Sequence, residues 1–243
     1  MTVTFIELGD KGQLGNQLFQ ISSVIGSALY HNDDWILPKW LYFNYFNIPA
    51  NYFSNEIHIN RIHNELCFHY AGIPSFKGEV VSLSGYYQAS KYWQDYANVV
   101  LKLLMPKRLG SYKDYTAIHV RRTDYLIHTE CYSILDMHNY YEKAMMACPS
   151  KNYLIFSDDL DWCKKHFVGN EFSFSEERHP AIDLGNMIGC KNNIIANSSF
   201  SWWAAWLNKT PDKKIVAPVT WFGPKLSLTH DTKDLLPKEW IKV

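Results

Sequence analysis

Two adjacent arginines are the residues whose type and position most directly suggest chemistry. Arg121 and Arg122 leave an apolar run that ends at Val120, with His119 just before them and Asp124 just after. Placing two guanidinium groups at the end of a buried strand is costly unless anionic groups meet them. The pattern favours a bidentate guanidinium clamp on a phosphate, and a structural Arg–Asp network that braces a loop is the alternative.

A run of asparagine and serine side chains forms a second polar cluster. Asn197, Ser198 and Ser199 precede Phe200 and a segment that contains three tryptophans. A turn of this kind between a strand and a helix offers hydroxyl groups and unpaired backbone amides to a phosphate. Simple capping of a core helix would place the same residues here, so the local sequence supports both interpretations equally.

A single aspartate, Asp183, interrupts an otherwise apolar helical segment at 181–190. Its carboxylate could cap the helix, or it could accept hydrogen bonds from a ligand. One carboxylate can accept from both the N1–H and the N2–H groups of a guanine, which adenine cannot reproduce. Asp183 is therefore a candidate guanine-reading residue, with helix capping as the more ordinary alternative.

The glycines near the N-terminus could shape a ligand-binding loop. Gly12, Gly15 and Asn16 follow an apolar segment and precede a helical pattern. The order of strand, glycine turn and helix begins many nucleotide-binding α/β domains. The spacing alone is a weak signal, because the GxGxxG dinucleotide fingerprint is absent.

Two other residue pairs raise the question of a metal site. Asp159 and Asp161 have the spacing of a divalent-ion site on a diphosphate, although aspartates in the first turn of a helix account for them equally well. Cys163 and His166 share a helix face, but no second pair at zinc-ligand spacing accompanies them. We expect ordinary packing for the second pair and no metal site.

Strand and helix patterns alternate along the chain and position these polar clusters. The predicted strands are 3–8, 80–83, 115–120, 153–156, 193–196 and 214–217, and the predicted helices are 18–29, 92–104, 139–147, 160–167, 181–190 and 199–207. Residues 31–76 show little periodicity and are expected to form loops and short helices. The alternation predicts an α/β fold with parallel sheets, whose ligands lie beyond the carboxyl ends of the strands.

The composition excludes several classes of protein. The chain has 243 residues with 24 Lys+Arg against 24 Asp+Glu and no long basic run, so no nucleic-acid partner is expected. The five cysteines are widely spaced, which favours a reducing compartment over a disulfide framework. No segment reaches the roughly 20 apolar residues of a membrane span, so a soluble, cytoplasmic protein is expected. A connector at 107–114 predicts two domains, 1–108 and 109–243.

With these residues in view, the chain resembles the bacterial-type α-1,2-fucosyltransferases of the GDP-fucose-dependent fucosyltransferase superfamily. The resemblance covers most of the chain and rests on several long motifs in the right order. They are Gly12–Gln20, Gly85–Tyr92, His119–Tyr125, Phe156–Asp159, Asp183–Cys190, Asn197–Trp203 and Ala217–Phe222. The resemblance implies a compact GT-B-like α/β fold with two facing Rossmann-like lobes, an acceptor-side lobe at 1–108 and a GDP-fucose-binding lobe at 109–243.

The resemblance also implies roles for individual residues. Arg121 would bind the β-phosphate, and His119 would lie near the nucleotide. Together with Asp124, which could act as a general base or only orient Arg121, they are the predicted catalytic residues. Arg122 would support the loop, and Asp183 would read the guanine. The other donor-binding residues that the resemblance implies are Gly15, Asn16, Asp159, Ser198, Ser199 and Phe200.

The reaction implied by the resemblance is an inverting transfer of L-fucose from GDP-β-L-fucose to a galactose-containing glycan, favouring O2 of a terminal β-galactoside. It needs neither a metal nor another cofactor. Asp124, His128, Glu130 and Asp159 are all possible general bases, and the sequence does not choose among them. Two rival hypotheses stand beside it: a metal-dependent glycosyltransferase that uses Asp159 and Asp161, and a noncatalytic module that binds a GDP-sugar or a glycan.

Overall fold

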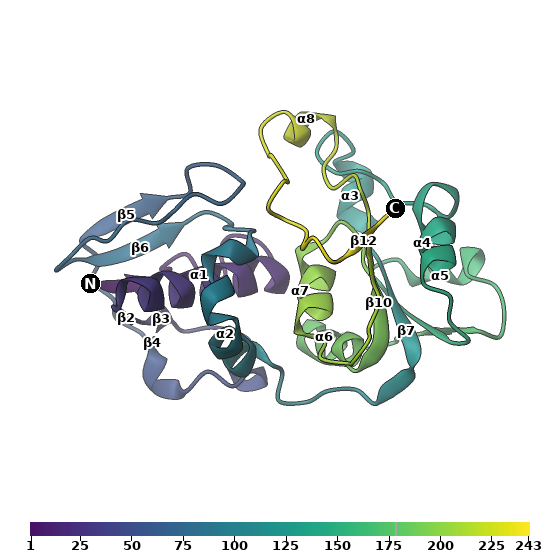
Figure 1. The fold of residues 1–243 in the computed structure, drawn as a ribbon, viewed down its shortest axis with the longest axis horizontal. Helices are drawn as coiled ribbons and strands as arrows, with labels where there is room; N and C mark the ends of the chain where they lie inside the picture. Colours follow the sequence, from purple (N-terminus) through teal and green to yellow (C-terminus); the bar gives the residue numbers. More distant parts are fainter. Residues whose placement is uncertain (178) are drawn as a thin grey trace. The chain divides into compact units, whose positions relative to one another are not determined.

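The computed structural model describes residues 1–177 and 179–243, which form two compact units (Figure 1). The first unit comprises Met1–Lys107 together with Asp231–Leu235, and the second comprises Arg108–His230 together with Leu236–Val243. The sequence prediction placed all of 109–243 in the second lobe, whereas the strap, as we call residues 231–235, belongs to the first. Asp234 accounts for this, because its carboxylate accepts the Tyr70 backbone N–H at 3.1 Å and pairs with Lys91 at 2.6 Å.

The first unit is built on a parallel sheet with the strand order β2-β1-β6-β5. Its strands are β1 (Thr2–Thr4), β2 (Asp34–Trp35), β5 (Arg61–Asn64) and β6 (Val80–Ser84), and β3 (Leu37–Pro38) pairs separately with β4 (Phe53–Ser54). Its helices are α1 (Leu14–His31) and α2 (Ala97–Leu104), with short 3₁₀ turns at Phe43–Tyr45, Ala50–Tyr52, Ser90–Tyr92 and Gln94–Tyr96. All strand pairs are parallel, as expected.

Two predicted elements of the first unit are shorter than their apolar patterns suggested. The strand predicted at 3–8 ends at Thr4, because the chain turns from residue 6 into the glycine loop. The helix predicted at 92–104 is α2 preceded by two 3₁₀ turns. Residues 31–76 contain short strands in addition to the expected loops and short helices.

Close packing against the last half of α1 explains one glycine in the first unit. Gly26 is buried, and a Cβ at this position would overlap the Tyr92 carbonyl oxygen and lie 2.9 Å from the Trp93 Cα. The indole of Trp93 is fully buried, and its ring centroid is 5.7 Å from that of Phe19 in α1. Glycine therefore lets the 90–93 backbone lie directly on the helix.

The Gly26→Ala variant should lose about 1–3 kcal/mol of unfolding free energy, because the new methyl group meets backbone atoms that cannot rotate away. Urea denaturation would measure the loss. Gly72→Ala is the matched control, since a Cβ there meets only the Tyr70 hydroxyl at 3.9 Å and should change stability by less than about 0.5 kcal/mol. Equal stability of the two variants would contradict the packing described above.

The second unit is a doubly wound α/β domain. Its strands are β7 (Tyr112–Val120), β8 (Tyr153–Ser157), β9 (Phe172–Phe174), β10 (Cys190–Ile194), β11 (Ile215–Ala217) and β12 (Ile241–Lys242), in the order β12-β11-β10-β7-β8-β9 with every pair parallel. Its helices are α3 (Thr123–Ile127), α4 (Glu142–Ala147), α5 (Leu160–His166), α6 (Pro180–Ile188), α7 (Ser199–Leu207) and α8 (Pro224–Ser227). Helices α4 and α5 cover one face of the sheet, and α6 and α7 cover the other (Figure 1).

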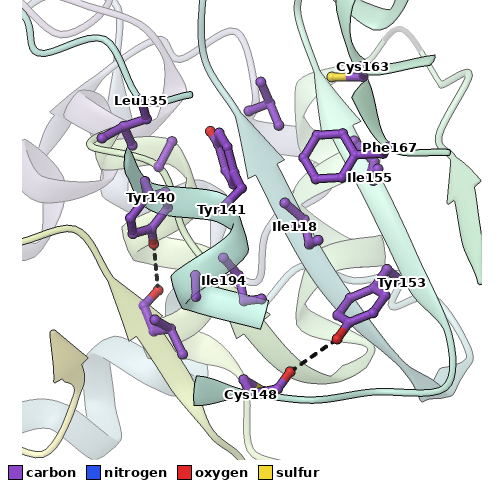
Figure 2. Close-up of a cluster of buried hydrophobic side chains, with 14 residues drawn as sticks. Ile118, Leu135, Tyr140, Tyr141, Cys148, Tyr153, Ile155, Cys163, Phe167 and Ile194 are labelled. Carbon is purple, nitrogen blue, oxygen red and sulfur yellow. Dashed lines mark hydrogen bonds between the residues drawn. The ribbon is translucent and has the colours of Figure 1, made fainter. Parts of the chain in front are cut away.

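Buried tyrosines fill the layer between the second sheet and α4 and α5 (Figure 2). Tyr140 is 2% exposed, and its hydroxyl donates to the backbone carbonyls of Ile195 at 2.6 Å and Val216 at 3.2 Å. The Tyr153 hydroxyl donates to the Cys148 carbonyl at 3.4 Å. Because these hydroxyl groups have hydrogen-bond partners, the large rings can be buried at little cost in free energy. The rings pack tightly under the strands that carry the polar clusters.

Most predicted elements of the second unit are present, and their ends differ for local reasons. The helix predicted at 139–147 begins earlier, in a π turn at Met137–Tyr141 that Asp136 caps, and continues as α4. The helix predicted at 181–190 is α6 and ends at Ile188, because Cys190 already pairs with Tyr112 in the sheet. The helix predicted at 199–207 is α7, with the same bounds.

Candidate active site

The strand order of the second unit reverses between β7 and β10, which are direct neighbours. In open α/β sheets, ligands bind beyond the carboxyl ends of the strands at such a switch point. Arg121 follows β7 there, and Ser198 follows β10. His119 of β7 links the two sides, because its Nδ1 lies 2.9 Å from the Ser201 Oγ of α7. The structure thus brings the first two polar clusters of the sequence together.

Two carboxylates hold the Arg121 guanidinium in place. Its Nη2 lies 2.8 Å from Asp124 Oδ1, and its Nη1 lies 3.2 Å from Asp158 Oδ2. The guanidinium also lies over the Tyr125 ring, 5.7 Å from the centroid. Burial by itself would lower the pKa of Arg121, but Asp158 and Asp124 outweigh it and raise that pKa. The group is therefore charged and oriented before any ligand arrives.

Arg121 keeps capacity for a ligand despite these pairs. A guanidinium carries five N–H donors, and each ion pair uses only one terminal nitrogen. Its side chain is 29% exposed, so the remaining donors are accessible from the switch point. Asp124 therefore acts on Arg121 as an orienting partner, as the bracing alternative predicted, and this role is compatible with a phosphate clamp.

Asp158 is the central residue of the arginine loop, and sequence reasoning did not single it out. Its carboxylate accepts hydrogen bonds from the Arg122 backbone N–H at 2.9 Å and from the Thr123 backbone N–H and hydroxyl at 3.2 and 2.6 Å, besides pairing with Arg121. It follows β8, the strand beside β7. Asp158 could have been identified from its position, because it is a carboxylate directly after β8, the strand that neighbours β7.

Asp159 has a different task from its neighbour. One carboxylate oxygen caps α5 by accepting the Trp162 backbone N–H at 3.1 Å, and the other lies 3.2 Å from the Arg122 Nε. The Arg122 guanidinium stacks over the Trp162 ring at 4.1 Å. Arg122 thus supports the loop, as the resemblance implies. Asp161 is an exposed residue in the first turn of α5, the ordinary position that the sequence analysis offered as an alternative to a metal site.

His119 is a buried, neutral histidine in this structure. It is 6% exposed, and its ring centroid lies 5.4 Å from that of Phe200. Burial lowers the pKa of His119 to about 3; the nearby Asp158 opposes this effect and Arg121 adds to it. At neutral pH the imidazole is therefore uncharged. It acts as a hydrogen-bonding group between β7 and α7 and lacks the second ring proton that an imidazolium would donate as a general acid.

The N-terminus of α7 faces the switch point without a side-chain cap. Ser198 occupies the N-cap position, but its hydroxyl makes no capping hydrogen bond. The first amides of a helix have no partner within the helix, and they favour an anion. Asn197 is 1% exposed and serves the fold, since its Nδ2 donates to the Ser133 and Trp221 carbonyls at 2.9 and 2.8 Å. Ser199 and Phe200 form the half-buried first turn.

Asp183 does not cap its helix, which corrects the more ordinary of its two interpretations. His179 is the N-cap of α6 and accepts the Ala181 N–H at 3.3 Å. Asp183 lies one turn into the helix, where it accepts a hydrogen bond from the Ser175 hydroxyl at 2.7 Å. Burial raises the pKa of Asp183 to about 6, against the effect of that hydrogen bond. Because α6 packs against α7, this carboxylate belongs to the same layer as the open helix end.

Gly15 and Asn16 lie in the first turn of α1, in the first unit. Gly15 is buried, and Asn16 is half-buried. Gln13 occupies the N-cap position without a side-chain cap, so this helix start also presents free amides. Two further side chains fix the loop before it: Gln17 Nε2 donates to the Gly12 carbonyl at 3.0 Å, and Gln20 Nε2 donates to the Lys11 carbonyl at 3.1 Å.

The other candidate bases lie at the surface, and the Cys163–His166 pair is divided between the core and the surface. His128 and Glu130 are exposed in the loop after α3, with 4.0 Å between His128 Nδ1 and Glu130 Oε1. Cys163 is buried in the core, whereas His166 lies at the surface and stacks on Trp162 at 4.1 Å. In the part of the chain that the structure describes, no group of three or more His, Cys, Asp or Glu side chains could hold a metal ion.

Residues 28–243 match the sequence model of glycosyl transferase family 11. The chain belongs to glycosyl transferase family 11. This membership confirms the fucosyltransferase resemblance that the motifs suggested. The family 11 match also spans the segments after β7, β8 and β10 that form the site described above.

Curated relatives agree with the family 11 assignment. The O-antigen biosynthesis glycosyltransferase WbnK of Escherichia coli is 39% identical over 130 residues, which cover 48% of this chain and 43% of the relative. An α-1,2-colitosyltransferase of Escherichia coli is 28% identical over 190 residues, 70% of this chain and 64% of the relative. A galactoside 2-α-L-fucosyltransferase of Caenorhabditis elegans is 24% identical, covering 95% of this chain and 76% of the relative. The chain thus spans less than two thirds of the two bacterial relatives.

Solved structures confirm the predicted GT-B-like fold of this family 11 chain. POFUT1 in complex with GDP superposes with a TM-score of 0.56 at 13% identity, covering 89% of this chain and 97% of that chain. The α-1,6-fucosyltransferase NodZ, soaked with GDP-fucose, gives a TM-score of 0.55 at 10% identity, with 87% and 93% coverage. Across residues 1–177 and 179–243, no helix has the length and apolarity to cross a membrane.

Proposed function

We propose that this family 11 chain transfers L-fucose from GDP-β-L-fucose to a glycan hydroxyl, with O2 of a terminal β-galactoside as the preferred position. One observation carries the proposal: Arg121 is held by Asp124 and Asp158 where β7 ends, at a switch point that also holds the open N-terminus of α7. The names of the relatives, which include an α-1,2-colitosyltransferase and a galactoside 2-α-L-fucosyltransferase, support the linkage and the acceptor.

The proposed chemistry is a single displacement with inversion at the anomeric carbon. The acceptor hydroxyl oxygen forms its bond from one face and releases its proton to solvent, while the bond to the β-phosphate oxygen breaks on the other face, through an oxocarbenium-like transition state. Negative charge then grows on the departing GDP. Arg121 and the first amides of α7 are preorganised to meet that charge, and interactions of this kind are worth roughly 3–4 kcal/mol each in the transition state.

The remaining donor contacts follow from the same proposal. Asp183 accepts the N1–H and N2–H groups of the guanine, while Ser198, Ser199 and Phe200 line the diphosphate. Arg122 and Asp159 brace the arginine loop, and His119 joins β7 to α7 as a neutral partner. The second unit then binds the donor. The first unit binds the acceptor, and its residues Gly15 and Asn16 contact the donor.

Fucosyl transfer should proceed in EDTA at the rate seen without it, because the proposed charge stabilisation comes from Arg121 and helix amides. GDP-fucose with a panel of galactoside acceptors, read by mass spectrometry with and without EDTA, measures this. Asp161→Ala should retain transfer activity, since Asp161 is exposed and outside the arginine network. Loss of product in EDTA and in Asp161→Ala would support the metal-dependent alternative instead.

The same assay separates the other hypotheses. Binding of GDP-fucose without transfer to any acceptor would support a noncatalytic module. The colitosyltransferase relative adds a second donor to the panel, because colitose is fucose without its 3-hydroxyl group. Transfer from the colitosyl donor alone would change the assigned donor sugar from fucose to colitose, and the assigned binding residues would stay the same.

A further inference from the structure

The first unit has a switch point of its own, and two amide side chains meet across it. Strands β1 and β6 are neighbours there, with α1 following β1 and the turn at 85–88 following β6. Gln88 Nε2 donates to Asn16 Oδ1 at 2.8 Å, across 72 positions of sequence. Gln88 is 7% exposed, so this hydrogen bond is shielded from water on the Gln88 side.

The hydrogen bond settles which end of the Asn16 carboxamide is presented outward. Because Oδ1 accepts from Gln88, Nδ2 is the end left to donate, and within the residues that the structure describes no partner takes it. Gly12 leaves room for this nitrogen, since a Cβ there would overlap Asn16 Nδ2, and its φ of +78° is one that glycine adopts readily. The carboxamide is therefore fixed in position and in orientation.

A half-buried carboxylate, that of Glu65, holds the turn that carries Gln88. Glu65 accepts the backbone N–H groups of Tyr86 and Tyr87 at 2.7 and 2.8 Å. The turn needs such support, because Tyr87 has a φ of +53°, which costs free energy for a residue with a Cβ. Gly85 lies against Glu65, where a Cβ would collide with the glutamate side chain. Glu65 thus fixes the backbone that aims Gln88 at Asn16.

We propose that Gln88 is a positioning residue that orients the Asn16 carboxamide so that Nδ2 donates to an oxygen of GDP-fucose, with Glu65 holding Gln88 through the 85–88 turn. The inference rests on the proposed function, which assigns Asn16 to the donor. The new element is that donor affinity depends on which end of the Asn16 carboxamide faces the donor, and not only on the presence of this side chain. An acceptor in place of Gln88 would turn the amide round and present Oδ1 to an anionic ligand.

Gln88→Glu makes that replacement with almost no change in shape. We expect Gln88→Glu to weaken GDP-fucose binding, measured by calorimetry, by about 10- to 100-fold, and to lower kcat/KM by the same factor. Asn16→Ala should give a similar loss. The double variant should lose no more than Asn16→Ala alone, because without the carboxamide there is nothing left to turn.

The non-additivity distinguishes orientation from general damage. If Gln88→Glu caused a further loss in the Asn16→Ala background, the new charge or a distorted fold would be acting directly, and the proposal would be wrong. Wild-type affinity and turnover in Gln88→Glu would overturn it too. Gln94→Glu is the matched control, because it is the same change at an exposed position of the first unit and should have no effect. Failure of the wild-type chain to bind GDP-fucose would reject the proposed function itself.

Glu65→Gln tests the second half of the proposal. Each turn amide donates to a different oxygen of Glu65, and glutamine replaces one of these oxygens by an NH2 group. The turn should therefore loosen, and donor affinity should fall by roughly 3- to 10-fold. This loss should also vanish in the Asn16→Ala background. Glu79→Gln, whose carboxylate pairs with Arg61 at the surface, is the matched control. A Glu65→Gln loss that persists without the Asn16 side chain would contradict the assigned role.

Discussion

Replacing Arg121 by alanine should lower kcat/KM for fucosyl transfer by about 10²–10³-fold while the chain stays folded. The loss is expected because no other side chain on the β7 loop can take over. Arg122 is held against Asp159 and Trp162, so its guanidinium is already committed. Initial rates with GDP-fucose and an acceptor from the panel, together with thermal unfolding, would measure both parts of the prediction.

Two further arginine variants show whether a loss of kcat/KM in Arg121→Ala reflects the geometry of this guanidinium or the removal of any arginine. Arg121→Lys keeps the charge but loses the planar fork that pairs with Asp124 and Asp158, so an intermediate rate is expected. Arg61→Ala removes an exposed arginine whose Nε lies 2.8 Å from the Glu79 carboxylate, and it should leave the rate unchanged. An Arg121→Ala enzyme with wild-type kcat/KM would refute the assigned role.

Replacing Asp183 by asparagine should relax the preference for guanine over adenine nucleotides and weaken GDP-fucose binding by about 10- to 100-fold. The carboxylate accepts two guanine N–H groups, whereas an amide turns one of its own N–H groups toward them. With a pKa of about 6, Asp183 also predicts that wild-type affinity falls as the pH drops from 7 to 5. GDP-fucose suits this titration, because its two phosphates are diesters and take up no proton near pH 6.

The raised pKa of Asp183 also makes the stability of the ligand-free protein depend on pH, and this dependence runs opposite to that of the affinity. The unfolded chain releases the Asp183 proton near pH 3.8 and the folded chain releases it near pH 6, so this group makes folding less favourable as the pH rises between them. Asp183→Asn should therefore be at least as stable as the wild type at pH 7. Asp161→Asn, the same change at an exposed site, should alter neither affinity nor stability. Unchanged discrimination between GDP and ADP in Asp183→Asn would remove the guanine assignment.

The site in the second unit could be predicted because its parts obey local rules. The apolar run before Arg121 required a buried strand, and strict alternation with helices required parallel pairing. Parallel strands end at one edge, so the arginines after β7 and the serines after β10 were predicted at the same edge of the sheet. The structure adds that these two strands are neighbours. The bounds of α7 could be read directly, since the polar turn at Asn197 and Ser198 precedes its apolar run.

The parts of the structure that could not be predicted depend on the direction in which a side chain points or on contacts between residues far apart in the sequence. Asp158 and Asp159 are equivalent as sequence, and only the start of α5 decides that one side chain caps the helix while the other returns to the arginine loop. The hydrogen bond between Gln88 and Asn16 joins residues that share no local pattern. The two- and three-residue strands, such as β9, are too short to show an alternation.

The strap has a consequence for any attempt to divide the molecule. A fragment that ends at residue 107 would lack Asp234, leaving Lys91 without its ion pair and the Tyr70 amide without its acceptor. A fragment that begins at 108 would keep those five residues with nothing of their own unit to bind, immediately before the segment that forms β12. Neither unit is a continuous stretch of chain, so one scission near residue 230 would remove a segment from both units at once. The fragment 231–243 would have to bind to both units again to restore them.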